Sequence, residues 1–292
     1  MSVLVNRMGV ESRVMATKLK LRASAKKRLA MTATRRSTAG SGFDFEGGVA
    51  AWVLLQALAG RGLPVEGVVQ RLQMQTGSLH WDIDDLLLTT QGARHLAISC
   101  KGNVQVSANG LPESFATQTW RLWTKADSPF DPATDCLALA TQGTHADFQS
   151  AWSDVKKFAT GDDAALALAQ IAANTRFKKI FDNLKAAAGA TVPDADVLGL
   201  IGRIDVLPFD FQQVPSKDER DAIAVARSLL LDGTEEEAKK LWDEIVDHAR
   251  KTRLDSGTLD MAGLRRWLRP RFALKDLPDY EPSWARLRAF ER

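Results

Sequence analysis

The chain has 292 residues, of which 45% are hydrophobic and 26% are charged. This composition is ordinary for a globular protein, and a chain of this length favours two domains over one. No run of about 18 apolar residues occurs, so the sequence predicts no transmembrane helix and no membrane partner. The two cysteines, Cys100 and Cys136, indicate neither a disulfide framework nor a zinc site, and we expect a cytoplasmic protein.

Charge is unevenly distributed along the chain. Residues 1–41 contain ten Lys or Arg residues and one acid, for a net charge of +9, whereas the remainder carries −6. Low hydrophobicity with high charge favours a disordered leader for this basic tail. An Arg-rich, acid-poor segment is also typical of a mitochondrial presequence, and a DNA-contacting arm would have the same charge. These three interpretations stay open.

Hydrophobic spacing predicts alternating helices and strands over residues 42–144. A helix is expected from Asp44 to Gly60, where apolar residues recur at helical spacing. Strands are expected at residues 65–73, 83–90 and 96–101, followed by a helix from Pro112 to Trp123 and a buried strand at residues 136–141. This order predicts an α/β domain in which helices flank a small mixed sheet.

After His145 the pattern becomes mainly helical. Thr234 and Glu237 have the spacing of a capping box. Amphipathic spacing predicts a short strand at residues 206–211 and helices near residues 148–158, 163–173, 177–184, 218–231, 234–251 and 259–268. We therefore expect a second, mainly α-helical domain at residues 145–292.

Charged residues that suit phosphodiester chemistry gather in the first domain. Glu46 lies on the first helix, Asp84 and Asp85 lie in the second strand, and Lys101 ends the third. Cutting a phosphodiester needs a divalent metal ion that polarises the phosphate and lowers the pKa of the attacking water. Magnesium takes hard oxygen ligands and keeps several waters, so one or two carboxylates suffice. A nearby lysine can orient the water and offset negative charge.

The register of the hairpin between the second and third strands decides which aspartate joins Lys101. A three-residue turn at residues 90–92, which ends in glycine, places Asp85 on the same face as Ser99 and Lys101. A two-residue turn would place Asp84 there instead. We favour Asp85.

Three segments in this order resemble the PD-(D/E)xK nuclease superfamily: GFDFEGGVAAWVLLQAL, WDIDDLLL and HLAISCKGN. More narrowly, residues 42–142 are similar to the double-stranded DNA nuclease domains at the N-terminus of bacterial anti-phage proteins, including those fused to STAND-type NTPases. Residues 238–284 resemble the helical region between nuclease and NTPase in such proteins. The resemblance implies a restriction-endonuclease-like fold for the first domain.

The resemblance also implies a set of site residues. Lys101 matches the catalytic lysine, Asp85 the metal-binding acid, and Glu46 the helix acid that completes the metal site. The implied cofactor is Mg²⁺. The carbonyl of Cys100 is a further oxygen ligand, and Asp84 is the acid that the other register would use.

One catalytic position departs from the family pattern. Ser99 lies where the family usually has Glu or Gln. A hydroxyl is a poor ligand for magnesium, so this departure weakens a two-acid metal site.

The resemblance implies a Mg²⁺-dependent endodeoxyribonuclease that cleaves double-stranded DNA as an effector of anti-phage defence. The acidic charge of residues 42–292 gives little general attraction to phosphates, which favours activation by assembly into a homo-oligomer. Two alternatives stay open. One is an inactive nuclease fold that binds nucleic acid or serves as a scaffold, and the other is a helical adaptor carried by residues 145–292.

No GxxxxGKS/T loop occurs, so the sequence predicts no ATP hydrolysis by this chain. The resemblance therefore implies an NTPase or sensor module that is absent from this chain, whether it was lost, is encoded separately or was removed by truncation.

Overall fold

The computed structural model describes residues 45–103, 106–108, 110–189, 191–211, 216–255 and 257–275, except for the side chains of residues 77 and 78. The basic tail at residues 1–41 and Asp44, where the first helix was expected to begin, lie outside these ranges. The chain divides between Phe43 and Asp44, so the described residues all belong to the unit that begins at Asp44.

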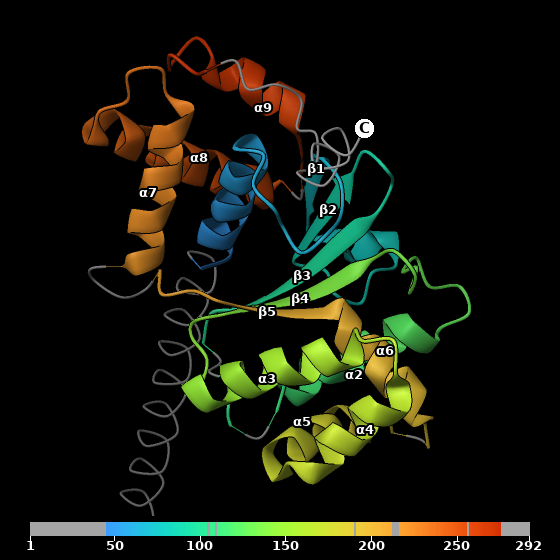
Figure 1. Ribbon diagram of the computed structural model, residues 1–292. Helices are drawn as coiled ribbons and strands as arrows, with labels where there is room; N and C mark the ends of the chain where they lie inside the picture. The colour runs from blue at the N-terminus through green and yellow to red at the C-terminus, as the bar shows by residue number, and fades with distance from the viewer. Residues whose placement is uncertain are drawn as a thin grey trace, which may run out of the picture. The chain divides into compact units, whose positions relative to one another are not determined.

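Within the described ranges, six strands form one mixed sheet in the order β5-β4-β3-β2-β1-β6 (Figure 1). β3, β4 and β5 are parallel neighbours, whereas β1 pairs antiparallel with β2 and β6, and β2 pairs antiparallel with β3. The predicted α/β class is therefore confirmed. The strands are β1 (Val69–Met74), β2 (Leu86–Thr90), β3 (His95–Lys101), β4 (Cys136–Thr141), β5 (Ile204–Pro208) and β6 (Thr258–Asp260).

Both faces of the sheet are buried. Leu86 and Leu88 of β2 pack into one hydrophobic cluster and Leu87 into the other, as the two-residue repeat of a strand requires. In β3, Ile98 packs into the first of these clusters and Ala97 into the second. Each fully buried leucine contributes about 1.5–3 kcal/mol to folding, which explains why the central strands are apolar throughout.

One face is covered by the first helix, at residues 45–58, together with three helices from the second half of the chain. In Figure 1 the first helix, drawn in blue, lies beside α8. Buried residues of all four helices join one cluster with that face of the sheet. The three later helices are α7 (Lys217–Leu229), α8 (Glu235–Leu254) and α9 (Met261–Leu268).

The opposite face is covered by five described helices, which appear in green and yellow below the sheet in Figure 1. Their buried residues form a second hydrophobic cluster with the other side of β2, β3 and β4. These helices are α2 (Glu113–Thr124), α3 (Ala146–Ala159), α4 (Ala164–Ala173), α5 (Thr175–Ala186) and α6 (Asp194–Arg203).

The expected boundary near residue 144 does not separate two cores. β5 and β6 lie in residues 145–292, yet they pair with β4 and β1 from the first half. Helices of the second half also cover both faces of this sheet. The structure therefore corrects the expected separate helical domain. Hydrophobic periodicity identifies each helix but does not tell which sheet its apolar face covers.

Most expected elements are present, with shifted ends. Thr234 and Glu237 form the predicted capping box at the start of α8. β1 and β2 begin at Val69 and Leu86, later than expected, and a short 3₁₀ helix, η1 (Thr76–Leu79), lies between them. The sequence did not predict α6, and the start of the last predicted helix is β6. No helix in the described ranges is long and apolar enough to cross a membrane.

Candidate active site

Asp85 is fixed against the end of β3. It lies one residue before Leu86, which pairs with Ile98. Its Oδ2 atom accepts a 2.7 Å hydrogen bond from the backbone N–H of Cys100 and a 3.3 Å hydrogen bond from the hydroxyl of Ser99. Ser99 thus holds the carboxylate of Asp85 in place.

The hairpin turn lies one residue later than predicted. Residues 91–93 form a three-residue turn, closed by a 2.9 Å hydrogen bond between the two flanking residues. Its last residue, Ala93, has a φ of 57°, whereas the predicted turn ended at Gly92. Because the turn still has three residues, Asp85 faces the end of β3 as expected, while Asp84 is exposed.

Lys101 ends β3 beside this carboxylate. Its Nζ atom lies 3.9 Å from Oδ2 of Asp85, and its side chain is 31% exposed. The next residue, Gly102, packs against the first helix, where an added Cβ atom would lie 2.8 Å from the Cβ atom of Phe45. The missing side chain lets the end of β3 approach the helix turn that carries Glu46.

Glu46 lies in the first turn of the helix at residues 45–58. Its side chain is 15% exposed and forms an ion pair with the guanidinium group of Arg253. Burial, followed by the negative charge of Asp85, raises the pKa of Glu46 to about 7. The positive charges of Arg253 and Lys101 act in the opposite direction. Glu46, Asp85 and Lys101 therefore share one electrostatic environment.

Burial acts on the neighbouring groups in the same way. Desolvation raises the pKa of Asp85, although the hydrogen bond from Cys100 and the charge of Lys101 lower it. Desolvation also raises the pKa of the Cys100 thiol, which lies in the hydrophobic cluster on the side of the first helix. The thiol packs as a small apolar group, so the oxygen that Cys100 can offer a cation is its carbonyl.

The oxygen donors suit a hard cation. Glu46 and Asp85 each resist ionisation because of burial and because of nearby negative charge. A divalent cation between them would offset both effects, and magnesium needs few protein ligands because it keeps several waters. Within the described ranges, no group of three or more His, Cys, Asp or Glu side chains that could hold a metal ion is found. The candidate ligands are therefore only two carboxylates, those of Glu46 and Asp85.

Sequence reasoning missed Arg253. This arginine lies on the buried side of α8, in line with Ile245 and Ala249, and is 8% exposed. An arginine on the apolar stripe of an amphipathic helix requires a buried acidic partner, because an unpaired buried charge is costly. The four-residue spacing from Ala249 to Arg253 was the signal that could have indicated such a partner.

Two cavities in the described ranges differ in their relation to the candidate site. One of about 460 Å³ lies beside it and is lined in part by Phe45, Phe211, Trp242 and Arg250. Phe211 stacks on Phe209 and on Trp242, with ring centroids 5.0 and 6.1 Å apart. The aromatic rings of this cavity therefore pack mainly against one another.

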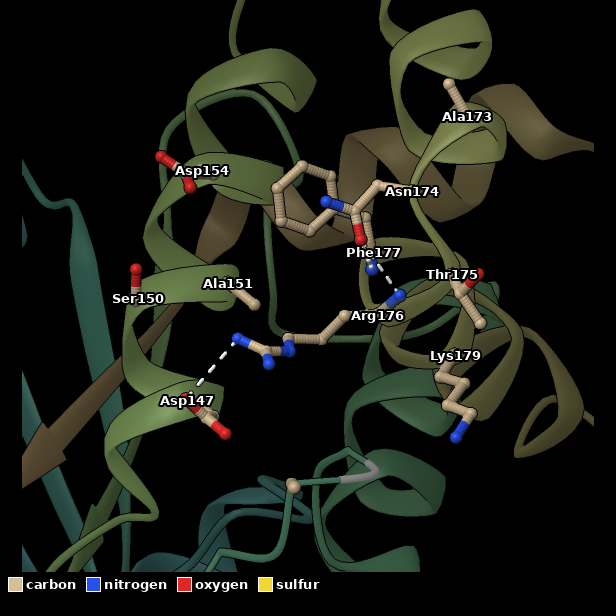
Figure 2. A pocket seen from close by; sticks show the side chains of 11 residues that line it. Asp147, Ser150, Ala151, Asp154, Ala173, Asn174, Thr175, Arg176, Phe177 and Lys179 are labelled. Carbon is tan, nitrogen blue, oxygen red and sulfur yellow. Dashed lines mark hydrogen bonds and ion pairs between the residues drawn. The ribbon is translucent and has the colours of Figure 1, made fainter.

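The other cavity, of about 770 Å³, lies between α3 and α5 and contains none of the residues predicted for the site. Figure 2 shows Arg176 of α5 reaching toward Asp147 of α3 across it, and the two form an ion pair of 3.4 Å. Acidic and basic side chains both line this cavity, so it presents no single charge to a ligand.

The chain matches no known protein-family model and no curated protein sequence. Two solved structures of the Acinetobacter baumannii Cap4 SAVED/CARF-domain containing receptor are similar to it. The structure with the cyclic trinucleotide 3'3'3'-cAAA shows 10% identity and a TM-score of 0.46, and the one with 2'3'3'-cAAA shows 11% and 0.45. Each match covers 78% of this chain and 45% of that chain. The match thus spans less than half the length of these receptors, and a likeness at this level assigns neither a family nor a function.

Proposed function

We propose that this chain is a Mg²⁺-dependent endonuclease that cleaves double-stranded DNA. The observation that carries the proposal is the pairing of Asp85 and Lys101, 3.9 Å apart at the end of a hairpin, whose charges act on the largely buried carboxylate of Glu46. The resemblance of residues 42–142 to PD-(D/E)xK nucleases supports the same assignment, because it matches these three residues to the catalytic positions of that superfamily.

Each residue has a distinct part in the proposed reaction. Glu46 and Asp85 would hold the ion, and a bound Mg²⁺ would polarise the phosphate and lower the pKa of the attacking water. Lys101 donates hydrogen bonds to the attacking water or to a phosphate oxygen and offsets negative charge that develops there. Ser99 and the backbone N–H of Cys100 keep Asp85 in place through its Oδ2 atom.

A basic surface on and after α9 suits the phosphate backbone of DNA. Residues 261–275 contain five Lys or Arg residues and no acid, although the overall charge of residues 42–292 is negative. Arg266, Arg269, Arg271 and Lys275 are exposed. A local cluster of this kind binds phosphates without sequence preference, so we propose that DNA lies along this surface.

Assembly is the proposed activating step, in an effector of anti-phage defence. A single site cuts one strand at a time, and the negative charge of residues 42–292 attracts DNA weakly outside the basic surface. Copies held together would supply two cuts and raise the local concentration of sites. The test compares nicking and double-strand cleavage by the full chain with and without a fused oligomerising tag. Equal specific activity in both would exclude activation by assembly.

The experiment for the proposed function is cleavage of a supercoiled plasmid by the full chain, with Mg²⁺ and with Mg²⁺ plus EDTA. The proposal predicts nicked or linear DNA with Mg²⁺ alone. Cleavage that survives EDTA, or no cleavage by either the free or the tagged protein, would contradict it.

A second candidate is a nuclease fold that binds DNA without cutting it. Ser99 favours this candidate, because its hydroxyl stands where a carboxylate or amide is usual. The same plasmid assay, run beside a gel-shift assay, separates the two. Binding without cleavage under all metal conditions would support the binding module.

A further inference from the structure

An ion pair joins the candidate metal site to α8, in the second half of the chain. Glu46 lies at the beginning of the first helix, and Arg253 lies near the end of α8. The side chains are 15% and 9% exposed, so both charges are largely removed from water. A buried charge is tolerated only when it is paired, which makes each side chain dependent on the other.

The first helix and α8 are in close contact at this pair. Gly47, the residue after Glu46, faces α8, and an added Cβ atom there would lie 2.7 Å from the Cγ atom of Arg250. Ile245 and Ala249 of α8 are fully buried in the hydrophobic cluster that also contains Val49 of the first helix. This packing fixes the backbone from which Arg253 extends, so the guanidinium group reaches Glu46 from a rigid position.

The charges at the site alternate in sign. Arg253 pairs with Glu46, and Lys101 lies close to Asp85. Two carboxylates near each other repel and would turn apart or take up a proton without such partners. Arg253 engages the Oε2 atom of Glu46, so it restricts the orientation of the carboxylate.

We propose that Arg253 is a positioning residue of the metal site, which holds Glu46 ready to bind a divalent cation and makes cation binding depend on the packing of α8. The inference rests on the proposed function and adds a residue from the second half of the chain to the site. Groups that orient metal ligands commonly change metal affinity or activity about 10- to 100-fold when they are removed.

An inhibitory contact would have the opposite effect. If Arg253 kept Glu46 from a cation, its removal would strengthen cation binding and speed cleavage. If it positions Glu46, its removal weakens both. The sign of the change therefore distinguishes the two roles.

The test uses Mn²⁺ as the probe and the full chain as the protein. Affinity for Mn²⁺ is measured by the electron paramagnetic resonance signal of the free ion, for the wild type, Arg253→Gln, Arg253→Lys and the control Lys251→Gln. Lys251 lies in the same last turn of α8 but is exposed and pairs with Asp247. We expect Arg253→Gln to weaken Mn²⁺ binding about 10- to 100-fold, Arg253→Lys to restore part of it, and Lys251→Gln to match the wild type.

A double-mutant cycle keeps the test decisive if Arg253→Gln lowers the melting temperature. In the Glu46→Gln background, a residue that acts through Glu46 has no further effect on Mn²⁺ affinity, whereas general loss of structure lowers it again. Wild-type or tighter Mn²⁺ binding by Arg253→Gln, or a further loss in the Glu46→Gln background, overturns the inference.

The inference and the proposed function fail in different ways. A wild type that cleaves DNA with Mg²⁺, together with an Arg253→Gln variant of unchanged Mn²⁺ affinity, overturns the inference alone. A wild type that neither binds Mn²⁺ nor cleaves DNA overturns both.

Discussion

The carboxylate of Asp85 lies 3.9 Å from the ammonium nitrogen of Lys101, on the neighbouring strand of an antiparallel hairpin. The hairpin brings these residues together, because the three-residue turn sets which side chains share a face. The pair lies at the strand ends and is only partly buried, so substitutions there can be expected to change chemistry more than folding.

Lys101→Ala should reduce plasmid cleavage by about 10²- to 10⁴-fold, the range typical of a lost acid–base or water-orienting group. Its side chain is 31% exposed and lies at the end of the strand, so the melting temperature should stay close to that of the wild type. Lys125→Ala is the matched control, because Lys125 is also partly exposed and lies 3.5 Å from Asp127. Loss of folding in Lys101→Ala would indicate a structural lysine.

Gly102→Ala should destabilise the protein by about 1–3 kcal/mol, as expected for overpacking, and should reduce cleavage. The added Cβ atom would lie 2.8 Å from the Cβ atom of Phe45, which forces the end of β3 away from the first helix. Gly92→Ala in the hairpin turn is the control, because nothing lies within 4 Å of its added Cβ atom. Chemical denaturation of both variants measures the difference. Equal stability would show that this close approach is not required.

Divalent cation binding should strengthen as the pH rises. Glu46 has a pKa of about 7, so protons compete with a cation for its carboxylate below that pH. Between pH 8 and pH 6 the ionised fraction falls about tenfold, and Mn²⁺ affinity should fall by a similar factor. The Glu46→Gln variant should show a weaker dependence, because Asp85 alone remains to titrate. Identical pH profiles would exclude Glu46 as a ligand.

Exposed arginines of the basic surface should contribute to DNA affinity through charge. Replacing Arg266 and Arg269 together by Gln should weaken DNA binding and reduce the slope of log K against log salt by about two. A double replacement of the exposed residues Lys157 and Lys179, on α3 and α5, is the charge-matched control. Gel-shift titrations at several salt concentrations measure both slopes. The same slope in both doubles would place the DNA elsewhere.

Local signals in the sequence predicted the elements of the fold better than their assembly. The apolar run CLALAT predicted β4 to the residue, and Pro112 marked the start of α2. The three-residue strand β6 was missed, because it is stabilised by pairing with β1, which no local pattern records. Because local patterns do not record strand pairing, the sequence also led us to expect a domain boundary near residue 144. The partners of β5 and β6 are distant in sequence.

The candidate site was predicted only in part, because some of its contacts join residues that are far apart in sequence. Asp85 and Lys101 are close in sequence and joined by one hairpin, so turn length was enough to place them on one face. The tie between Glu46 and Arg253 depends on packing of two helices that are far apart along the chain. The sequence showed an arginine on an apolar stripe, but its partner becomes apparent only in the folded structure.

The most direct test of the central claim is the rate of Mg²⁺-dependent plasmid cleavage by the wild type and by Asp85→Asn, measured side by side. The asparagine side chain keeps an oxygen that can accept the hydrogen bond from Cys100, so the hairpin should stay folded while the negative charge is lost. We predict cleavage by the wild type that stops with EDTA, and loss of cleavage in Asp85→Asn at an unchanged melting temperature. Equal cleavage rates for the two proteins would contradict a metal-dependent nuclease site at Asp85.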